Sequence, residues 1–214
     1  MQETLNRIKT CGIIPVIKID SADDAVPLCK ALAAGGLFAA EITFRTDAAE
    51  ESIRRVAAEL PETLLGAGTV LSTLTAEKAI AAGAKFIVSP GTNPEVVRYC
   101  IKNNIVIIPG VCTPTDIELG LSLGLTALKF FPAEAAGGLK MLKAVSAPYS
   151  QICFMPTGGI DEKNLAEYLS FKPVIACGGS WMVRDELIKN KDWAEITRLS
   201  REAAEIKNKT RNDI

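Results

Sequence analysis

One lysine stands out as a candidate nucleophile. Lys129 interrupts the apolar run 127–130, where the side chains of a strand would point alternately to its two faces. Leu128 and Phe130 would then face covering helices, whereas Lys129 and Phe131 would face an interior. Desolvation disfavours the ammonium form of a lysine in apolar surroundings, so a neutral, nucleophilic amine becomes accessible. Such an amine can form a Schiff base with a ketone, and the alternative is a lysine that only neutralises a buried carboxylate.

A second set of polar residues ends another apolar run. Glu41, Thr43 and Arg45 occupy alternate positions, so they share one face of a predicted strand. An ionised side chain within such a strand costs several kcal/mol unless it is paired or used chemically. One interpretation is a structural salt bridge between Glu41 and Arg45. Another is that Glu41 neutralises Lys129, which is compatible with its moving protons for that lysine.

Two glycine-rich turns provide a candidate phosphate site. The segments PTGGI (156–160) and CGGSW (177–181) follow the last two predicted strands. Exposed backbone N–H groups, together with a hydroxyl, are suited to bind a phosphate. Each pair of glycines could also form a plain tight turn, and we interpret the segments 66–69 and 90–91 in that way. Thr69 carries a hydroxyl that could donate a hydrogen bond to a carboxylate.

The residues that the chain lacks restrict the chemistry further. It contains no histidine, which removes the commonest general base and every Ser–His or Cys–His nucleophile pair. The six cysteines are scattered without a C-x-x-C pair, so we interpret them as small buried hydrophobes of a reducing compartment. The chemistry must come from other side chains.

The elements that would position these residues repeat along the chain. Eight short apolar runs end 20 to 26 residues apart, which leaves room for one helix in each interval. This alternation predicts an α/β fold, a single (β/α)8 TIM barrel over residues 1–214, and the active sites of such barrels lie at the carboxyl ends of the strands. A doubly wound open sheet is the alternative. The predicted strands are 12–17, 37–43, 64–69, 86–90, 105–110, 127–130, 152–156 and 174–177.

Helix boundaries can also be predicted. The segments 21–24 and 47–50 resemble capping boxes, and Asn93 and Thr113 each precede a proline at a first helical position. A last amphipathic helix follows the eighth strand. We expect it to end in a short polar tail from about Lys207.

The composition is that of a globular protein. Hydrophobic residues make up 48% of the 214 residues, which excludes a disordered chain. The 24 Lys and Arg against 25 Asp and Glu give a net charge of −1 without a basic block, so we expect no nucleic-acid partner. The longest uncharged run, 144–160, is broken by Pro148 and Pro156, so we expect no membrane span. The first nine residues offer no apolar signal core, which favours a cytoplasmic protein.

Seven motifs together resemble one enzyme family, the 2-keto-3-deoxy-6-phosphogluconate (KDPG)/4-hydroxy-2-oxoglutarate (KHG) aldolases. They occur in order over nearly the whole chain, and the lysine motif beside the Glu–Arg motif is the most specific feature. The motifs are EITFRT (41–46), GAGTV (66–70), SPG (89–91), PGV (109–111), LKFFPA (128–133), PTGGI (156–160) and GGSW (178–181).

The resemblance implies a metal-independent class I aldolase with no cofactor, usually a homotrimer. Lys129 would form an imine with the C2 ketone of a 2-keto acid substrate, and Glu41 would move protons through water. Arg45 would bind the pyruvate carboxylate with both arms of its guanidinium, and Thr69 and Pro90 would line that end. The protonated imine would accept the electrons of the developing carbanion, so neither a metal nor a histidine is needed.

The resemblance also assigns the other half of the site. Phe131 would pack against the imine, and Thr157 would favour the gluco configuration at C4. The phosphate would be held by Gly158, Gly159 and Ser180.

The expected reaction is cleavage of KDPG to pyruvate and glyceraldehyde 3-phosphate. The close alternative is KHG, which yields pyruvate and glyoxylate and carries no phosphate. A non-catalytic barrel that binds a phosphorylated ligand would not need Lys129 and Glu41 together, and an isomerase or epimerase would lack the imine lysine. Two residues depart from the family pattern: Lys18 replaces a common arginine, and Asp116 replaces the usual glutamate.

Overall fold

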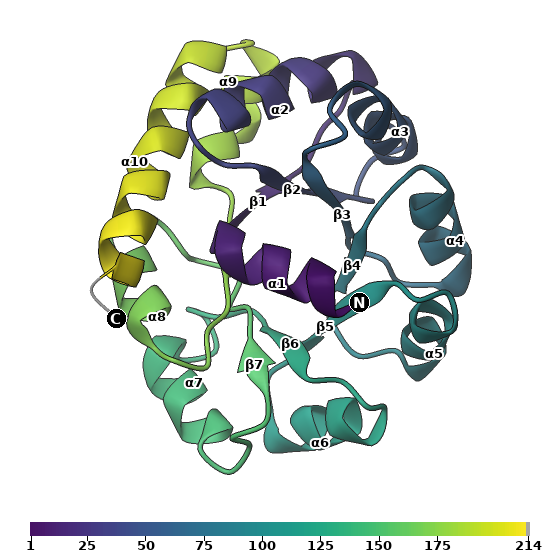
Figure 1. Cartoon of the computed structure of the whole chain (residues 1–214), viewed down its shortest axis with the longest axis vertical. Helices are drawn as coiled ribbons and strands as arrows, with labels where there is room; N and C mark the ends of the chain where they lie inside the picture. The colour runs from purple at the N-terminus through teal and green to yellow at the C-terminus, as the bar shows by residue number, and fades with distance from the viewer. Residues whose placement is uncertain (213–214) are drawn as a thin grey trace.

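Eight parallel strands form one curled sheet in the computed structural model, which describes residues 1–212. They follow one another in the order β7-β6-β5-β4-β3-β2-β1-β8, with helices around the outside (Figure 1). The strands are β1 Ile13–Ile17, β2 Ala39–Thr43, β3 Leu64–Gly68, β4 Phe86–Ser89, β5 Val106–Val111, β6 Ala127–Phe130, β7 Cys153–Phe154 and β8 Cys177–Gly179.

The edges of the sheet, β7 and β8, are linked by two single parallel pairings. Phe154 pairs with Val174 and Thr157 pairs with Gly178. A doubly wound sheet would reverse its strand order at a switch point, whereas β1 to β7 lie here in unbroken chain order. The doubly wound alternative is therefore wrong, and the fold is a parallel α/β architecture of the TIM-barrel kind.

Helices connect the strands and cover the sheet. Two of them begin where the sequence predicts, because Asn93 and Thr113 cap helices whose first residue is proline. The helices are α1 Gln2–Cys11, η1 Ala22–Asp24, α2 Ala25–Ala34, α3 Ala49–Glu59, α4 Thr73–Ala81, α5 Pro94–Lys102, α6 Pro114–Ser122, α7 Gly138–Ser146, α8 Leu165–Ser170, η2 Trp181–Val183, α9 Asp185–Lys189 and α10 Trp193–Asn212.

Apolar side chains fill both sides of the sheet. Phe86, Ile108 and Ala127 belong to the cluster inside the sheet, whereas Leu128 and Phe130 belong to the cluster between the sheet and the helices. This confirms the predicted alternation along β6. Because each large buried apolar side chain contributes about 1.5–3 kcal/mol, these two layers hold the strand ends in place.

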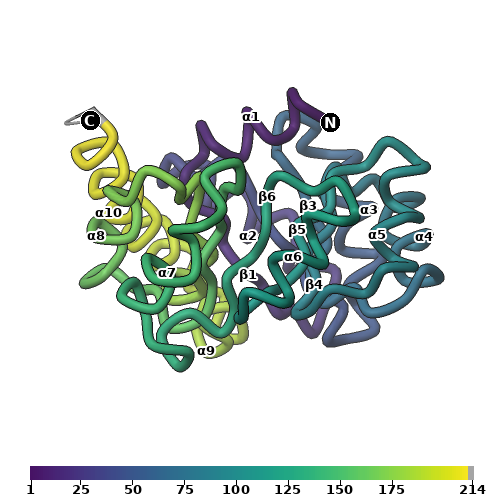
Figure 2. Tube along the Cα trace, turned by 90° about the horizontal axis from the view of Figure 1, so that it is seen from below, coloured from purple at the N-terminus to yellow at the C-terminus, as the bar shows by residue number. Residues whose placement is uncertain are grey.

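Helix α1 covers the amino-terminal end of the strands (Figures 1 and 2). Its Ile8 is fully buried and packs with Ile14 and Phe86 in the inner cluster. Helix α9 lies at the opposite end of the molecule (Figure 2). Helix α1 therefore covers the inner cluster at the amino-terminal end of the sheet.

Two predicted capping boxes differ from the structure. The N-cap of α3 is Ala48, which has no side-chain oxygen, so the capping box at 47–50 is wrong. Ser21 does accept a hydrogen bond from the N–H of Asp23, but it caps the short helix η1. In both places the chain makes a tight turn before the long helix begins.

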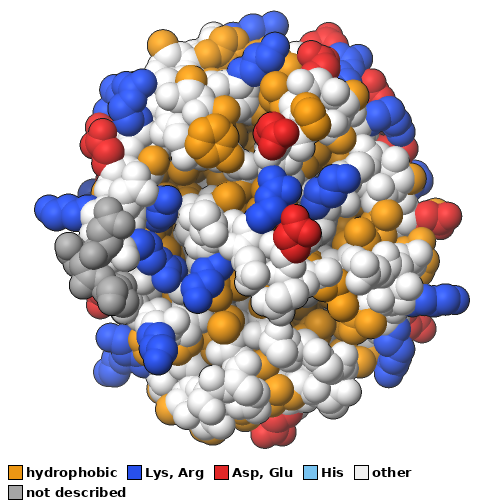
Figure 3. Space-filling model, in the orientation of Figure 1, with side chains coloured by type: hydrophobic (Ala, Val, Ile, Leu, Met, Phe, Trp, Pro, Cys, Tyr) orange, Lys and Arg blue, Asp and Glu red, His pale blue; other side chains and the backbone are white. Residues whose placement is uncertain are grey.

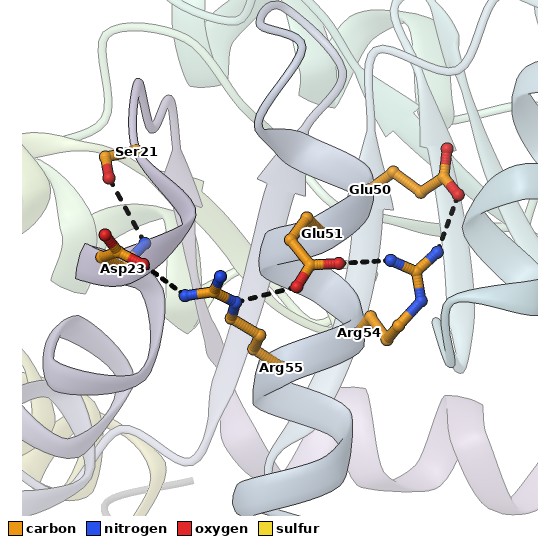
Figure 4. Close-up of polar contacts among 6 residues, drawn as sticks. All are labelled: Ser21, Asp23, Glu50, Glu51, Arg54 and Arg55. Atoms are coloured by element: carbon orange, nitrogen blue, oxygen red, sulfur yellow. Dashed lines mark hydrogen bonds and ion pairs between the residues drawn. The ribbon is translucent and has the colours of Figure 1, made fainter.

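The acidic residues at the start of α3 form a surface network instead (Figure 4). Arg54 pairs with Glu50 and Glu51, and Arg55 pairs with Glu51 and with Asp23 of η1. Hydrogen bonds from Arg55 and Arg54 lower the pKa of the Glu51 carboxyl. Such exposed pairs each contribute little to stability, so we assign the network a role in joining η1 to α3.

The eighth strand begins later than the predicted run 174–177. It spans Cys177–Gly179, so Gly178 and Gly179, for which the sequence predicts a turn, lie within the sheet. Gly178 and Gly179 pair with Ile14 and Pro15 of β1. A Cβ added at Gly179 would come within 1.9 Å of the Trp181 ring, so the strand needs glycine there.

The last helix is longer than expected. Helix α10 continues to Asn212, so the polar tail predicted from about Lys207 is wrong for residues 207–212. Nη2 of Arg211 donates to the carbonyl of Val174 at 2.8 Å, which ties the end of the helix to the segment before β8. Residues 213–214 of the predicted tail lie outside the described residues.

The surface carries both signs of charge. On the face that α1 covers, basic and acidic side chains are interspersed among apolar ones (Figure 3). Among the helices of residues 1–212, none combines the length and apolar character that a membrane crossing requires.

Candidate active site

A cavity of about 240 Å³ opens at the carboxyl ends of the strands. Active sites of TIM barrels lie at this end. All of the site residues predicted from the sequence line this cavity, namely Glu41, Arg45, Thr69, Pro90, Lys129, Phe131, Thr157, Gly158, Gly159 and Ser180. The cavity is also lined by Val16, Thr43, Ile160, Gly178 and Gly179, and the sequence analysis did not single out Val16 or Ile160 as site residues.

Lys129 and Glu41 meet in the cavity. The lysine Nζ on β6 lies 3.7 Å from Oε1 of the glutamate on β2, and the two side chains are only 7% and 1% exposed. Nζ also lies 5.0 Å from the centre of the Phe131 ring. Because the pair is shielded from water, each charge depends on the other for compensation. The arrangement places an amine and a proton-accepting carboxylate within reach of one bound molecule.

The Glu41 carboxylate lies over Gly68 of the neighbouring strand β3. A Cβ added at Gly68 would come within 2.1 Å of Oε1, and one added at Gly66 would come within 2.2 Å of the Phe86 ring. The prediction of a plain turn at 66–69 is therefore wrong, because residues up to Gly68 belong to β3 and make room for neighbouring side chains. Within the described chain, no hydrogen-bond donor reaches either Glu41 oxygen. Both oxygens are therefore available to accept a hydrogen bond from a bound molecule.

Arg45 extends from the end of β2 and is exposed. Its Nε donates to Oγ1 of Thr43 at 3.1 Å, and that hydroxyl donates to the carbonyl of Ile17 at 2.8 Å. This chain of two hydrogen bonds fixes the guanidinium at the cavity wall. Glu41 pairs with Lys129 rather than with Arg45, so the predicted salt bridge within β2 is not the arrangement found.

Thr69 and Pro90 line the cavity after β3 and β4. Thr69 has a φ of 57°, a left-handed conformation that is uncommon for a residue with a side chain and places local backbone strain at the cavity. The carbonyl oxygen of Pro90 would lie 2.0 Å from a Cβ at Gly110. The loop after β4 is thus packed directly on the backbone of β5.

The two glycine-rich segments meet at the other end of the cavity. Gly158 and Gly159 have φ values of 100° and 79°, so they need glycine for their backbone conformation. Gly178 needs glycine for space, because a Cβ there would come within 2.4 Å of the Thr157 hydroxyl. Ser180 is exposed at the edge of the same cavity. The arrangement can present backbone N–H groups and a hydroxyl to an anion.

Lys18 lies outside this set of lining residues. Its Nζ lies 3.2 Å from a carboxylate oxygen of Asp20 and 3.2 Å from one of Asp185. Hydrogen bonds with Asp20 and Asp185 raise the pKa of Lys18. The lysine that replaces the family's common arginine is therefore neutralised by two carboxylates.

Asp116, the second departure, completes a capping box at the start of α6. It accepts hydrogen bonds from the N–H groups of Cys112 and Thr113, and Thr113 Oγ1 accepts one from the N–H of Asp116. Burial alone would raise the pKa of the Asp116 carboxyl, but these hydrogen bonds lower it. The shorter acid therefore fits this helix start.

The cysteines near the cavity differ in access. Cys177 is buried, and burial raises the pKa of its thiol, which keeps it protonated. Cys112 is partly exposed. In the part of the chain that the structure describes, no group of three His, Cys, Asp or Glu side chains is placed to hold a metal ion.

The fold and the cavity define a class of enzyme. A buried lysine paired with a glutamate at the carboxyl end of a TIM-barrel-like sheet is suited to chemistry on a carbonyl compound. The chain belongs to the KDPG and KHG aldolase family, whose sequence model matches residues 4–199.

Curated relatives agree with this assignment. The 2-dehydro-3-deoxy-phosphogluconate aldolase of Haemophilus influenzae is 47% identical over 205 residues, which cover 96% of this chain and 97% of the relative. The KHG/KDPG aldolase of Escherichia coli K12 is 43% identical over 198 residues, which cover 92% and 93%.

A solved structure resembles the whole chain. The KDPG aldolase of Legionella pneumophila, with pyruvate captured at low pH as a covalent carbinolamine intermediate, has a TM-score of 0.90 and 42% identity. The match covers 94% of this chain and 97% of that one.

Proposed function

We propose that this protein is a class I aldolase that cleaves KDPG to pyruvate and glyceraldehyde 3-phosphate. The observation that carries the proposal is the buried pair of Lys129 and Glu41, 3.7 Å apart in the cavity. The aldolases named among its relatives, and the carbinolamine formed by the Legionella pneumophila enzyme, support the same chemistry.

The first step joins the substrate to Lys129. The neutral amine attacks the C2 ketone, and Glu41 relays a proton to the oxygen to give a carbinolamine. Glu41 then gives the proton that it took from the lysine ammonium to the departing hydroxyl, so that loss of water leaves a protonated imine between Nζ and C2 and a carboxylate on Glu41. The apolar ring of Phe131 beside Nζ shields this step from bulk water.

The second step breaks the carbon–carbon bond. Glu41 accepts the proton of the C4 hydroxyl through a water molecule, and C4 becomes an aldehyde as the C3–C4 bond breaks. The bonding electrons move into the protonated imine and give an enamine. The enamine then takes up a proton at C3, and hydrolysis of the resulting imine releases pyruvate and regenerates the lysine.

Binding would divide between the two ends of the cavity. Arg45 would bind the pyruvate carboxylate, with Thr69 and Pro90 alongside. Thr157 would contact C4 and select its configuration. The phosphate would be held by Gly158, Gly159 and Ser180, through N–H groups and one hydroxyl.

KHG is a second candidate substrate. The Escherichia coli relative is named for both compounds, and KHG would use the same imine while leaving the phosphate end without a phosphate.

Further properties of the protein belong to the same proposal. Residues 1–214 would act as a single domain, with the sheet a closed (β/α)8 barrel, as the pairings between β7 and β8 support. The protein would be a cytoplasmic homotrimer in a pathway of the Entner–Doudoroff type, without a metal, a cofactor or a nucleic-acid partner.

The test is pyruvate release from each substrate, followed with a lactate dehydrogenase coupling enzyme. We expect KDPG cleavage to exceed KHG cleavage in kcat/KM and to survive dialysis against EDTA. Release of pyruvate from neither substrate would refute the proposal. Loss of activity after dialysis, restored by a divalent cation, would refute the imine mechanism.

A further inference from the structure

A buried tyrosine outside the cavity makes a contact that the aldol mechanism does not use. Tyr168 on α8 is only 1% exposed, and its hydroxyl donates to Oε1 of Glu134. Burial, together with the hydrogen bond to Glu134, raises the pKa of this hydroxyl, so it remains protonated and able to donate. A phenylalanine would fill the same core space, so the hydroxyl requires its own explanation.

Glu134 lies on the loop between β6 and α7, directly against the glycine turn. A Cβ added at Gly159 would come within 2.6 Å of the Glu134 Cβ. The N–H of Glu134 donates to the carbonyl of Gly158 at 3.0 Å, and the N–H of Ala133 donates to that of Thr157 at 2.8 Å. The loop that carries Phe131 is therefore joined along its length to the turn at 157–159.

The helix that carries Tyr168 also holds the turn from its other side. Asn164, just before α8, donates through Nδ2 to the carbonyl of Gly159 at 2.9 Å. Its Oδ1 accepts a hydrogen bond from the N–H of Asp161 at 3.0 Å. Helix α8 thus contacts Gly159 through Asn164 and, through the Tyr168–Glu134 hydrogen bond, fixes the loop that packs on it.

We propose that Tyr168 and Glu134 are positioning residues that hold the turn at 157–159 in the conformation that binds the substrate phosphate. This proposal rests on the proposed function, because it concerns the phosphorylated substrate. Neither glycine of the turn has a side chain that would restrict its backbone, so the conformation of the turn depends on contacts with its neighbours. The Tyr168–Glu134 hydrogen bond adds to these contacts because it fixes the residue whose N–H donates to Gly158.

The test compares Tyr168→Phe with wild type on both substrates. The variant keeps the ring in the core, and Glu134 is exposed and can bind water instead, so the fold should persist. We expect KM for KDPG to rise about five- to tenfold, as for loss of one ordinary hydrogen bond, with kcat within about twofold. The kcat/KM for KHG should stay within about twofold.

Two further variants sharpen the result. Glu134→Gln keeps an oxygen that can accept a hydrogen bond from the Tyr168 hydroxyl, so its KM for KDPG should stay near that of wild type. Tyr149→Phe is the matched control. The Tyr149 hydroxyl donates a hydrogen bond of 3.0 Å to Glu118, and neither residue lines the cavity. Its kinetics should not change.

Hydrogen exchange provides a readout that does not depend on activity. The amides of Ala133 and Glu134 should exchange faster in Tyr168→Phe than in wild type or Tyr149→Phe, because their acceptors lie on the released turn. Equal losses on KDPG and KHG, or unchanged KM and unchanged exchange, would overturn the positioning role. A wild-type protein that cleaves neither substrate would instead refute the proposed function, and the exchange comparison would still test the restraint.

Discussion

The two ends of the cavity present different chemical groups to a bound molecule. The end beside β2 and β6 is lined by ionisable side chains on the strands, and two of them, Lys129 and Glu41, are almost completely buried. At the end of β7 and β8, the chain offers backbone N–H groups at Gly158 and Gly159 and an exposed hydroxyl at Ser180. The buried charges of Lys129 and Glu41 are shielded from water, whereas the serine beside the glycine turn is exposed to it.

This difference assigns separate tasks to the two ends. Buried charges change the reactivity of whatever ketone reaches them, because desolvation and pairing govern the proton transfers. A glycine turn with an exposed serine can bind an anion but holds no amine that could form an imine. Changes at the first end should therefore affect every substrate, and changes at the second end only the phosphorylated one.

The largest effect is expected at Lys129. Lys129→Ala should lower kcat by about 10⁴-fold or more on KDPG and KHG alike, because the covalent intermediate is lost. The same change leaves Glu41 buried without its partner, so the urea midpoint should fall as well. The double variant Lys129→Met/Glu41→Gln should recover stability but not activity. Substantial turnover in Lys129→Ala would contradict the account of this end.

Glu41→Gln should have the next largest effect. It keeps the size of the side chain but removes proton transfer, so kcat should fall about 10²- to 10³-fold on both substrates. Steady-state kinetics with KDPG and KHG in parallel would measure the loss. A loss confined to KDPG would contradict this role, because it would mean that Glu41 acts on the phosphate end of the substrate and not on the proton transfers that both substrates share.

Gly68→Ala tests the same end without altering a reactive group. The added Cβ would come within 2.1 Å of Glu41 Oε1 and must displace the carboxylate. Displacements of about 1 Å cost on the order of 10²-fold in rate, so kcat should fall by about that factor on both substrates. Gly91→Ala, where an added Cβ meets nothing within 4 Å, is the control and should retain wild-type rates.

Ser180→Ala should produce a smaller and selective effect. Loss of one hydrogen bond to a phosphate should lower kcat/KM for KDPG about tenfold and leave that for KHG within about twofold. The ratio of the two specificity constants is the measurement. An equal loss on both substrates would show that the two ends are not separate.

The smallest effect on catalysis is expected outside both ends, at Asp116. Asp116→Ala removes the capping carboxylate of α6 and should lower stability by about 1 kcal/mol with unchanged kinetics. The folded-state pKa of Asp116 lies below its ordinary value of 3.8, so this stabilisation is present above that pH and is lost as the pH falls further. Urea unfolding of wild type and variant should therefore differ at pH 7 and converge in acid. A difference that persists in acid would contradict the assignment to the carboxylate.

The sequence predicts the positions of Lys129 and Glu41 better than the backbone conformation of the neighbouring strands. Lys129 and Glu41 could be found because charged residues in apolar runs are conspicuous and strand alternation fixes the side they face. The glycines of β3 and β8 were misinterpreted as turns. Gly68 and Gly179 are required by the Glu41 carboxylate and the Trp181 ring, which approach from elsewhere in the chain.

Boundaries that depend on tertiary contacts also escaped prediction. The end of α10 is fixed by Arg211 on a carbonyl of the segment before β8, which local polarity cannot reveal. The first turn of α3 looked like a capping box, but its acids pair with Arg54 and Arg55 on the next turn. Element order and the alternating faces of the strands, in contrast, follow from local pattern alone.

The most direct test of the account is to trap the imine. The protein would be incubated with pyruvate and borohydride, and its intact mass and peptide map would be recorded. The Schiff-base mechanism requires one reduced pyruvate adduct per chain, on the peptide that contains Lys129, with Lys129→Ala as the unlabelled control. A folded protein without an adduct, or with its adduct on another lysine, would show that Lys129 does not form the imine.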